Sequence, residues 1–110
     1  MMVTGACLLV GKEKFESVEG FDETYPLSFN DADFCLKLMD QGFNNIFTPY
    51  CHLLHHESLT RGYNDTKIKQ SAATQKFEVL RRKWTETLSH GDPFISNHLR
   101  YEHYFEDQIQ

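Results

Sequence analysis

Apolar residues form an almost continuous run over Val3–Val10, with a valine at each end. A run of this length is typical of a strand that is buried on both faces inside an α/β sheet. Two further extended stretches are predicted at Asn45–Pro49 and Tyr50–His55, with a bend at Pro49. The pattern therefore predicts about three strands. Because the first begins almost at residue 1, we expect part of the fold to lie upstream of this chain.

Apolar residues at helical spacing predict three helices. Lys12–Val18 forms one or two turns, and Gly20 stops it. A second helix runs from Asn30, as its N-cap, to a stop at Gly42, with apolar positions at Phe34, Cys35, Leu38 and Met39. The longest helix is expected between Asp65 and Leu88, with a wide apolar stripe of Ile68, Ala72, Phe77, Leu80, Trp84 and Leu88.

Length, charge and cysteine content narrow the class of protein. The 110 residues suit one compact domain, and a formal charge of −5 argues against a broad electrostatic grip on nucleic acid or anionic lipid. Apolar runs are far shorter than the roughly 20 residues of a membrane span, and the N-terminus has no secretory signal pattern. We therefore expect a cytoplasmic protein. Three cysteines without C-x-x-C spacing are expected to be reduced and mostly buried.

Two acidic residues, Asp31 and Asp33, stand at the predicted start of the second helix. One interpretation is simple capping, because acidic side chains favour the first turn of any helix. The other is catalytic, because a carboxylate presented there can act as general base toward a hydroxyl group. Position alone leaves both interpretations open.

A second group of candidates follows the last predicted strand. Cys51 and His55 share a face of that strand but lie roughly 13 Å apart at about 3.3 Å per residue, so they do not hold one zinc ion together. His55 and His56 face opposite sides, so at most one of them points into a given site. Each is either a metal ligand or an ordinary surface histidine. Arg61 is either a phosphate-binding guanidinium or a solvated charge.

The order of motifs resembles the C-terminal half of a family 2 glycosyltransferase, of the rhamnosyltransferase-like kind. The resemblance covers about residues 3 to 62 and extends more loosely to the segment Asp92–Phe94. It is carried by six segments in order: Thr4–Val10 (TGACLLV), Gly20–Glu23 (GFDE), Asn30–Leu38 (NDADFCLKL), Thr48–Tyr50 (TPY), His55–Ser58 (HHES) and Arg61–Gly62 (RG).

The resemblance implies a partial GT-A fold of α/β class, with a short mixed sheet and about three helices. It implies that Asp31 is the general base of an inverting sugar transfer, that Thr4, Gly5, Asp33 and Arg61 bind substrate, and that His55 contacts a metal ion. The complete enzyme is expected to use a nucleotide-sugar donor, a glycan or lipid-linked acceptor and Mn²⁺ or Mg²⁺, in polysaccharide biosynthesis at the inner face of the membrane.

The chain departs from the family pattern in two places. Asn30 stands where an acidic residue is usual, and the donor-binding half with its Asp-x-Asp motif is absent. We therefore expect residues 1–62 to be the acceptor-side half of a catalytic domain, 63–90 a long amphipathic helix, and 91–110 a tail. The alternative is a catalytically inactive orphan fragment. In either case we expect a homo-oligomer, because the first strand would expose its edges and both apolar faces.

Overall fold

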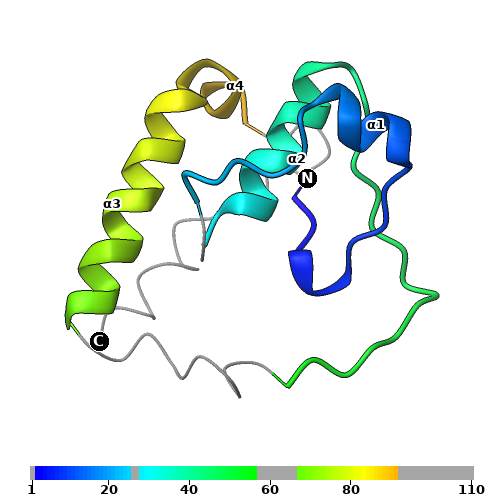
Figure 1. The fold of residues 1–110 in the computed structure, drawn as a ribbon, viewed down its shortest axis with the longest axis horizontal. Helices are drawn as coiled ribbons and strands as arrows, with labels where there is room; N and C mark the ends of the chain where they lie inside the picture. Colours follow the sequence, from blue (N-terminus) through cyan, green and yellow to red (C-terminus); the bar gives the residue numbers. More distant parts are fainter. Residues whose placement is uncertain (1, 26–27, 57–66, 92–110) are drawn as a thin grey trace.

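The computed structural model describes residues 2–25, 28–56 and 67–91 (Figure 1). Its elements are a 3₁₀ turn η1 (Gly5–Cys7) and four helices, α1 (Lys12–Ser17), α2 (Asn30–Asp40), α3 (Lys67–Lys83) and α4 (Thr85–Ser89). The predicted helices over 12–18 and 30–42 are confirmed. The tail after residue 91 and the loop that carries Arg61 lie outside the described residues.

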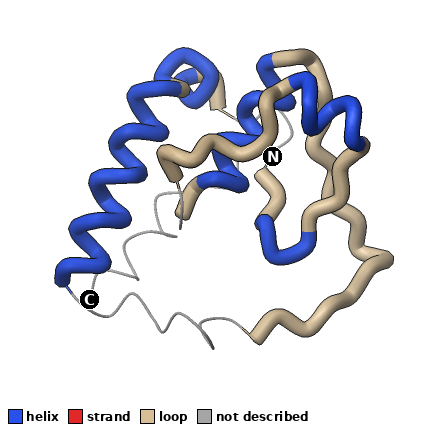
Figure 2. The backbone as a smooth tube through the Cα atoms, in the orientation of Figure 1, coloured by secondary structure: helices blue, strands red, loops and turns tan. Residues whose placement is uncertain are grey.

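The predicted mixed sheet is wrong: no residue in the described ranges belongs to a strand, as Figure 2 shows. In the Val3–Val10 run, the chain turns at η1, where the Thr4 hydroxyl accepts from the Ala6 N–H. The Val3 N–H donates to the Cys35 sulfur and the Gly5 N–H donates to the Asp31 carboxylate. These backbone donors are therefore used by α2, and none of them pairs with a second extended segment as a strand requires.

The segment 43–56 also lacks regular structure, although the expected bend at Pro49 is present as a turn at residues 49 and 50. A strand needs a neighbour to complete its hydrogen bonds, and the described residues provide none here. The segment therefore leaves large side chains exposed: Ile46, Phe47, Tyr50, Leu53 and Leu54.

Helix α2 lies between α1 and α3 (Figure 1) and contributes to two apolar clusters. The first joins Phe34 and Leu38 of α2 to Val18, with Leu8, Val10, Phe15 and Phe43 packed around them. The rings of Phe15, Phe21 and Phe34 lie 4.9–5.6 Å apart in tilted and edge-on contacts. The second cluster joins Leu36 to Tyr25 and Leu80, with Phe29, Ala32, Trp84 and Leu88 at its edge. Both faces of α2 are thus buried.

The ends of these helices follow the sequence with small differences. Phe29, in a left-handed conformation, is the N-cap of α2, and Asn30 is its first residue instead of the cap. At the other end, Gly42 has φ +82°, and the bonds Gly42 N–H to Met39 C=O and Phe43 N–H to Leu38 C=O form a Schellman motif. Gly20 has φ +60°, and a Cβ there would lie 2.6 Å from the Phe15 ring, so only glycine fits.

The long C-terminal helix is interrupted at Trp84, which has φ −112° and ψ 25°. The Thr85 hydroxyl donates back to the carbonyls of Arg81 and Arg82, a contact that bends helices. The prediction for the cysteines is also corrected. All three are free, but only Cys35 is buried, whereas Cys7 and Cys51 are exposed because the strands that would have covered them do not form.

Candidate functional site

The structure brings together two of the residues that the sequence nominated, Gly5 and Asp31. The Gly5 N–H donates to Asp31 Oδ2 over 2.8 Å, although 26 positions separate them in the chain. A Cβ on Gly5 would lie 3.4 Å from the Asp31 Cβ, so the backbone approaches closely because residue 5 has no side chain. Thr4, beside it, is exposed. The TGA motif therefore lies against the start of α2.

The Asp31 carboxylate is held in a fixed orientation by backbone donors. Its Oδ1 accepts from the Ala32 N–H at 2.9 Å, while Oδ2 is bound by Gly5. The side chain of Asn30 accepts from the Asp31 N–H at 2.8 Å and orders the first turn of α2. The half-buried carboxylate keeps further lone pairs, because each oxygen has about two acceptor positions.

Asp33, two residues further on, lies in a different environment. Its side chain is completely buried, at 0 % exposure. Oδ1 accepts from the Trp84 indole N–H at 2.7 Å and from the Lys83 ammonium at 2.8 Å. Oδ2 lies 3.8 Å from the Lys37 ammonium and accepts no hydrogen bond within the described residues. In this structure Asp33 joins α2 to the junction of α3 and α4, and its expected contact with substrate stays a prediction.

Lys83 extends this contact to a third segment. Its ammonium also binds Asp22 Oδ2 at 3.0 Å, so that one cation bridges two carboxylates. Burial alone would lower the pKa of Lys83, but the hydrogen bonds that its ammonium donates to Asp33 and Asp22 outweigh burial and raise the pKa. The hydroxyl and backbone N–H of Thr24, followed by Lys83, hold the pKa of Asp22 well below its usual range. We call Asp22, Asp33, Lys83 and Trp84 the clamp.

Burial in the same packed region also shifts the pKa of two further side chains, Tyr25 and Cys35. Burial raises the pKa of the Tyr25 hydroxyl, whose ring lies 5.8 Å from the Lys83 ammonium. Burial also raises the pKa of the Cys35 thiol, whose sulfur exchanges hydrogen bonds with the backbone of Val3. A thiol in this state is a structural side chain and a poor nucleophile.

Sequence reasoning missed three members of the clamp: Asp22, Lys83 and Trp84. Asp22 was noted only as part of the GFDE motif, and Trp84 only as an apolar position on a helix. No spacing rule connects positions 22, 33 and 83, since only the packing of α3 on α2 brings them together. The sequence does hold one indication that Asp33 is buried, because this residue stands directly before the most apolar turn of α2.

The metal prediction at His55 stays a prediction. His55 is exposed, and no group of three or more His, Cys, Asp or Glu side chains in the described part of the chain is arranged to hold a metal ion. The donors present here do not fit a metal centre by themselves. In the described ranges, no helix is both long and apolar enough to cross a bilayer.

Three known proteins are similar to this chain over part of their length. An uncharacterised protein, y4gI, of Sinorhizobium fredii is 38% identical over 101 residues, which are 91% of this chain and 11% of that protein. The O-antigen biosynthesis protein RfbC of Myxococcus xanthus is 39% identical over 99 residues, 90% of this chain and 7% of RfbC. An N-acetylglucosaminyl-diphospho-decaprenol L-rhamnosyltransferase of Mycobacterium tuberculosis is 35% identical over 60 residues, 54% of this chain and 20% of the enzyme.

The chain thus spans a fifth or less of the length of these relatives. No family model matches it, and no solved structure is significantly similar to it. Two of the relatives have names that denote glycan synthesis, one in O-antigen formation and one in rhamnose transfer. These names support the resemblance to glycosyltransferases at the level of the class of protein, and the short matches are consistent with a fragment.

Proposed function

We propose that this chain is the acceptor-side part of an inverting glycosyltransferase that acts in polysaccharide synthesis. The hydrogen bond between Gly5 and Asp31 is the observation that carries the proposal, because it joins two motifs that the resemblance assigns to one sugar site. The names of the relatives support the same class of activity. The nucleotide-sugar donor would be bound by a part of the enzyme outside this chain.

In this proposal Asp31 is the general base. It takes the proton of an acceptor hydroxyl while the hydroxyl oxygen attacks the anomeric carbon of the donor and the nucleoside diphosphate leaves. Two backbone N–H groups orient the carboxylate, so that little reorganisation is needed when the acceptor arrives. Thr4 lies beside Gly5 on the exposed side of the site and offers a hydroxyl to a sugar.

The other roles that the resemblance implies are also proposals. His55 is a candidate ligand for the divalent cation of the complete enzyme, and Arg61 a candidate contact for the diphosphate. Because the described residues do not form a metal centre, we derive no step of the reaction through a metal ion.

A second candidate function is an inactive module that self-associates. The observation that favours it is the exposed apolar segment after α2, where Tyr50 is 94% exposed. In that case the Asp31 carboxylate only joins the Gly5 backbone to the start of α2, and the amide oxygen of asparagine would keep one of these two backbone hydrogen bonds.

The first test uses the 110-residue chain alone. We expect it to transfer no sugar and to bind nucleotide sugars with a dissociation constant above about 10 μM (about −7 kcal/mol), because no donor pocket is expected in it. Calorimetric titration with several nucleotide sugars and Mn²⁺ measures this. Tighter binding would show that the chain has a donor site of its own.

The second test separates the two candidates. In a chimera, the stretch of the Myxococcus O-antigen protein that matches this chain is replaced by the corresponding 99 residues of this chain. Any 99 consecutive residues of the 110 include Asp31. We expect the chimera to restore O-antigen in a strain that lacks the relative. Asp31→Asn should abolish restoration, because loss of a general base lowers turnover by about 10²–10⁴. Glu13→Gln, an exposed acidic residue of α1, is the matched control. Full restoration by Asp31→Asn would favour the inactive module.

A further inference from the structure

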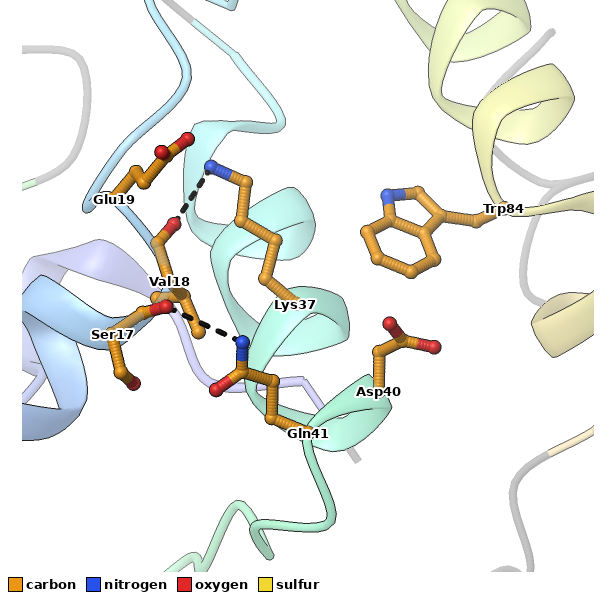
Figure 3. Close-up of a pocket in the computed structure, with 7 residues that line it drawn as sticks. All are labelled: Ser17, Val18, Glu19, Lys37, Asp40, Gln41 and Trp84. Carbon is orange, nitrogen blue, oxygen red and sulfur yellow. Dashed lines mark hydrogen bonds between the residues drawn. The ribbon is translucent and has the colours of Figure 1, made fainter.

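A pocket of ≈ 330 Å³ opens near the C-terminal end of α2 (Figure 3). Its walls come from three places: the end of α1 (Ser17–Glu19), the last turns of α2 (Lys37, Asp40 and Gln41), and Trp84. In Figure 3 the α2 residues stand between the end of α1 and the indole. A volume of this size is at the lower end of the range for small-ligand sites.

Three of the wall residues are held in place by hydrogen bonds. The Trp84 indole N–H donates to buried Asp33 at 2.7 Å. The Lys37 ammonium donates to the carbonyls of Val18 and Gly20, at 3.3 and 3.1 Å. The Gln41 amide N–H donates to the Ser17 carbonyl at 3.3 Å. Side chains that are ordered before a ligand arrives lose less entropy when it binds.

The polar atoms that these bonds leave at the pocket are mainly acceptors. They are the carboxylates of Glu19 and Asp40 and the amide oxygen of Gln41, whereas the ammonium of Lys37 is already bound to two carbonyls. Two carboxylates against one ammonium disfavour an anionic ligand. A ligand that suits these walls donates several hydrogen bonds and also has an apolar face for the indole.

Neutral saccharides have both properties. Their hydroxyl groups donate to carboxylate and amide oxygens, and the C–H face of a pyranose ring packs on the electron-rich face of an aromatic ring. From Asp31 to Asp40 the helix rises about 13 Å at 1.5 Å per residue, so this pocket is separate from the proposed reaction centre. We propose that the pocket between α1, α2 and Trp84 binds a neutral sugar unit.

Glu19 is the residue after the C-cap of α1. Its φ is 59°, and the bonds Glu19 N–H to Glu16 C=O and Gly20 N–H to Phe15 C=O form a Schellman motif, so glycine suits this backbone position. The Glu19→Gly variant therefore separates binding from stability: it suits the left-handed backbone and removes the carboxylate, so we expect a more stable protein that binds sugar less well.

The experiment is a titration of the 110-residue chain with methyl glycosides of rhamnose, galactose and N-acetylglucosamine. Trp84 is the chain's one tryptophan, so its emission reports on the pocket directly. We expect saturable changes with dissociation constants on the order of 1–10 mM, because a monosaccharide has few heavy atoms with which to contact the pocket. This binding does not depend on the proposed transferase function, because no donor or turnover is involved.

Two variants and two probes decide the outcome. Asp40→Ala and Glu19→Gly should each weaken sugar binding at least threefold, whereas Glu86→Gln in α4, outside the pocket, should not change it. Emission changes that rise linearly with sugar and are matched by glycerol would overturn the proposal. Unchanged sugar affinity in the Asp40→Ala variant would overturn it as well. Saturable binding of choline in preference to sugar would also overturn it, because the pocket would then be a site for organic cations.

Discussion

Helix α2 and the segment that follows it, residues 43–56, are both rich in large apolar side chains, but only the helix buries them. Phe34 in α2 is 0% exposed, whereas Tyr50 in the segment is 94% exposed. The helix satisfies its backbone internally and has apolar neighbours on two faces. Beyond residue 45, the extended segment has neither a partner for its backbone in another element nor a surface to cover its large apolar side chains within the described residues. Apolar sequence therefore becomes a core only where a second element is present.

The largest expected effect concerns the exposed segment. We expect the chain to self-associate at micromolar concentration, corresponding to about −8 kcal/mol, with a second copy covering Ile46, Phe47, Tyr50, Leu53 and Leu54. Sedimentation at several concentrations measures it. The double variant Phe47→Asp with Leu54→Asp should be monomeric, because a second copy would bury its charges. If the unmodified chain is a stable 12.9 kDa monomer, the segment is covered by other parts of the same chain.

A pair of alanine variants tests the comparison directly. Phe34→Ala should lower the free energy of unfolding by about 3–5 kcal/mol, since it leaves a cavity among the rings of Phe15 and Phe21. Phe47→Ala should change it by less than about 0.5 kcal/mol in monomeric protein, because Phe47 is exposed. Urea unfolding followed by far-ultraviolet circular dichroism gives both numbers. Similar losses in the two variants would mean that the segment is packed in solution.

The clamp joins α2 to the end of α3 through polar contacts, and a substitution at Lys83 tests how much these contacts contribute to stability. Lys83→Met should lower the free energy of unfolding by about 1–3 kcal/mol, because it removes one partner of the buried Asp33 carboxylate while Trp84 and Lys37 remain. The value is discounted because the Lys83 side chain is itself 36% exposed. The Trp84 emission should shift to longer wavelength if α3 moves away from α2. Lys12→Met, at an exposed pair on α1, is the matched control and should have little effect.

The smallest expected effect is a pH dependence of the same clamp. The pKa of Asp22 is lowered in the folded protein, so its contribution to stability is complete above about pH 4, the unfolded value, and is lost as the pH falls below it. The raised pKa of Lys83 has the opposite sign: its contribution is complete below about pH 10.4 and is lost at higher pH. Asp22→Asn should therefore flatten the acid side of the stability profile in urea titrations between pH 6 and 2.5. An unchanged acid slope would exclude Asp22 as its source.

The helices could be predicted from the sequence because their signals are local. The spacing of apolar residues from Phe34 onward and the stop at Gly42 depend only on neighbours along the chain. The strands could not be predicted in the same way. An apolar run such as Val3–Val10 becomes a strand only if a neighbour receives its hydrogen bonds, and here Asp31 and Cys35 of α2 receive two of them instead.

The candidate site, like the fold, could be predicted from the sequence only in part. The sequence nominated Asp31 through a helix start and Gly5 through a resemblance that assigns both to sugar binding, but the hydrogen bond between them comes only from the structure. It gave no sign that Lys83 would bridge Asp22 and Asp33 or that Trp84 would interrupt the last helix.

The sequence by itself determined where α1 and α2 begin and end, the acidic start of α2 and the glycines at positions 20 and 42, because these depend on local backbone geometry and spacing. The tertiary structure decided that Asp33 is buried and Asp31 half-buried, that Gly5 binds the Asp31 carboxylate, and that Trp84 forms a wall of a pocket. Contacts between residues 26 to 61 positions apart depend on how helices pack, and no local signal in a chain encodes that packing.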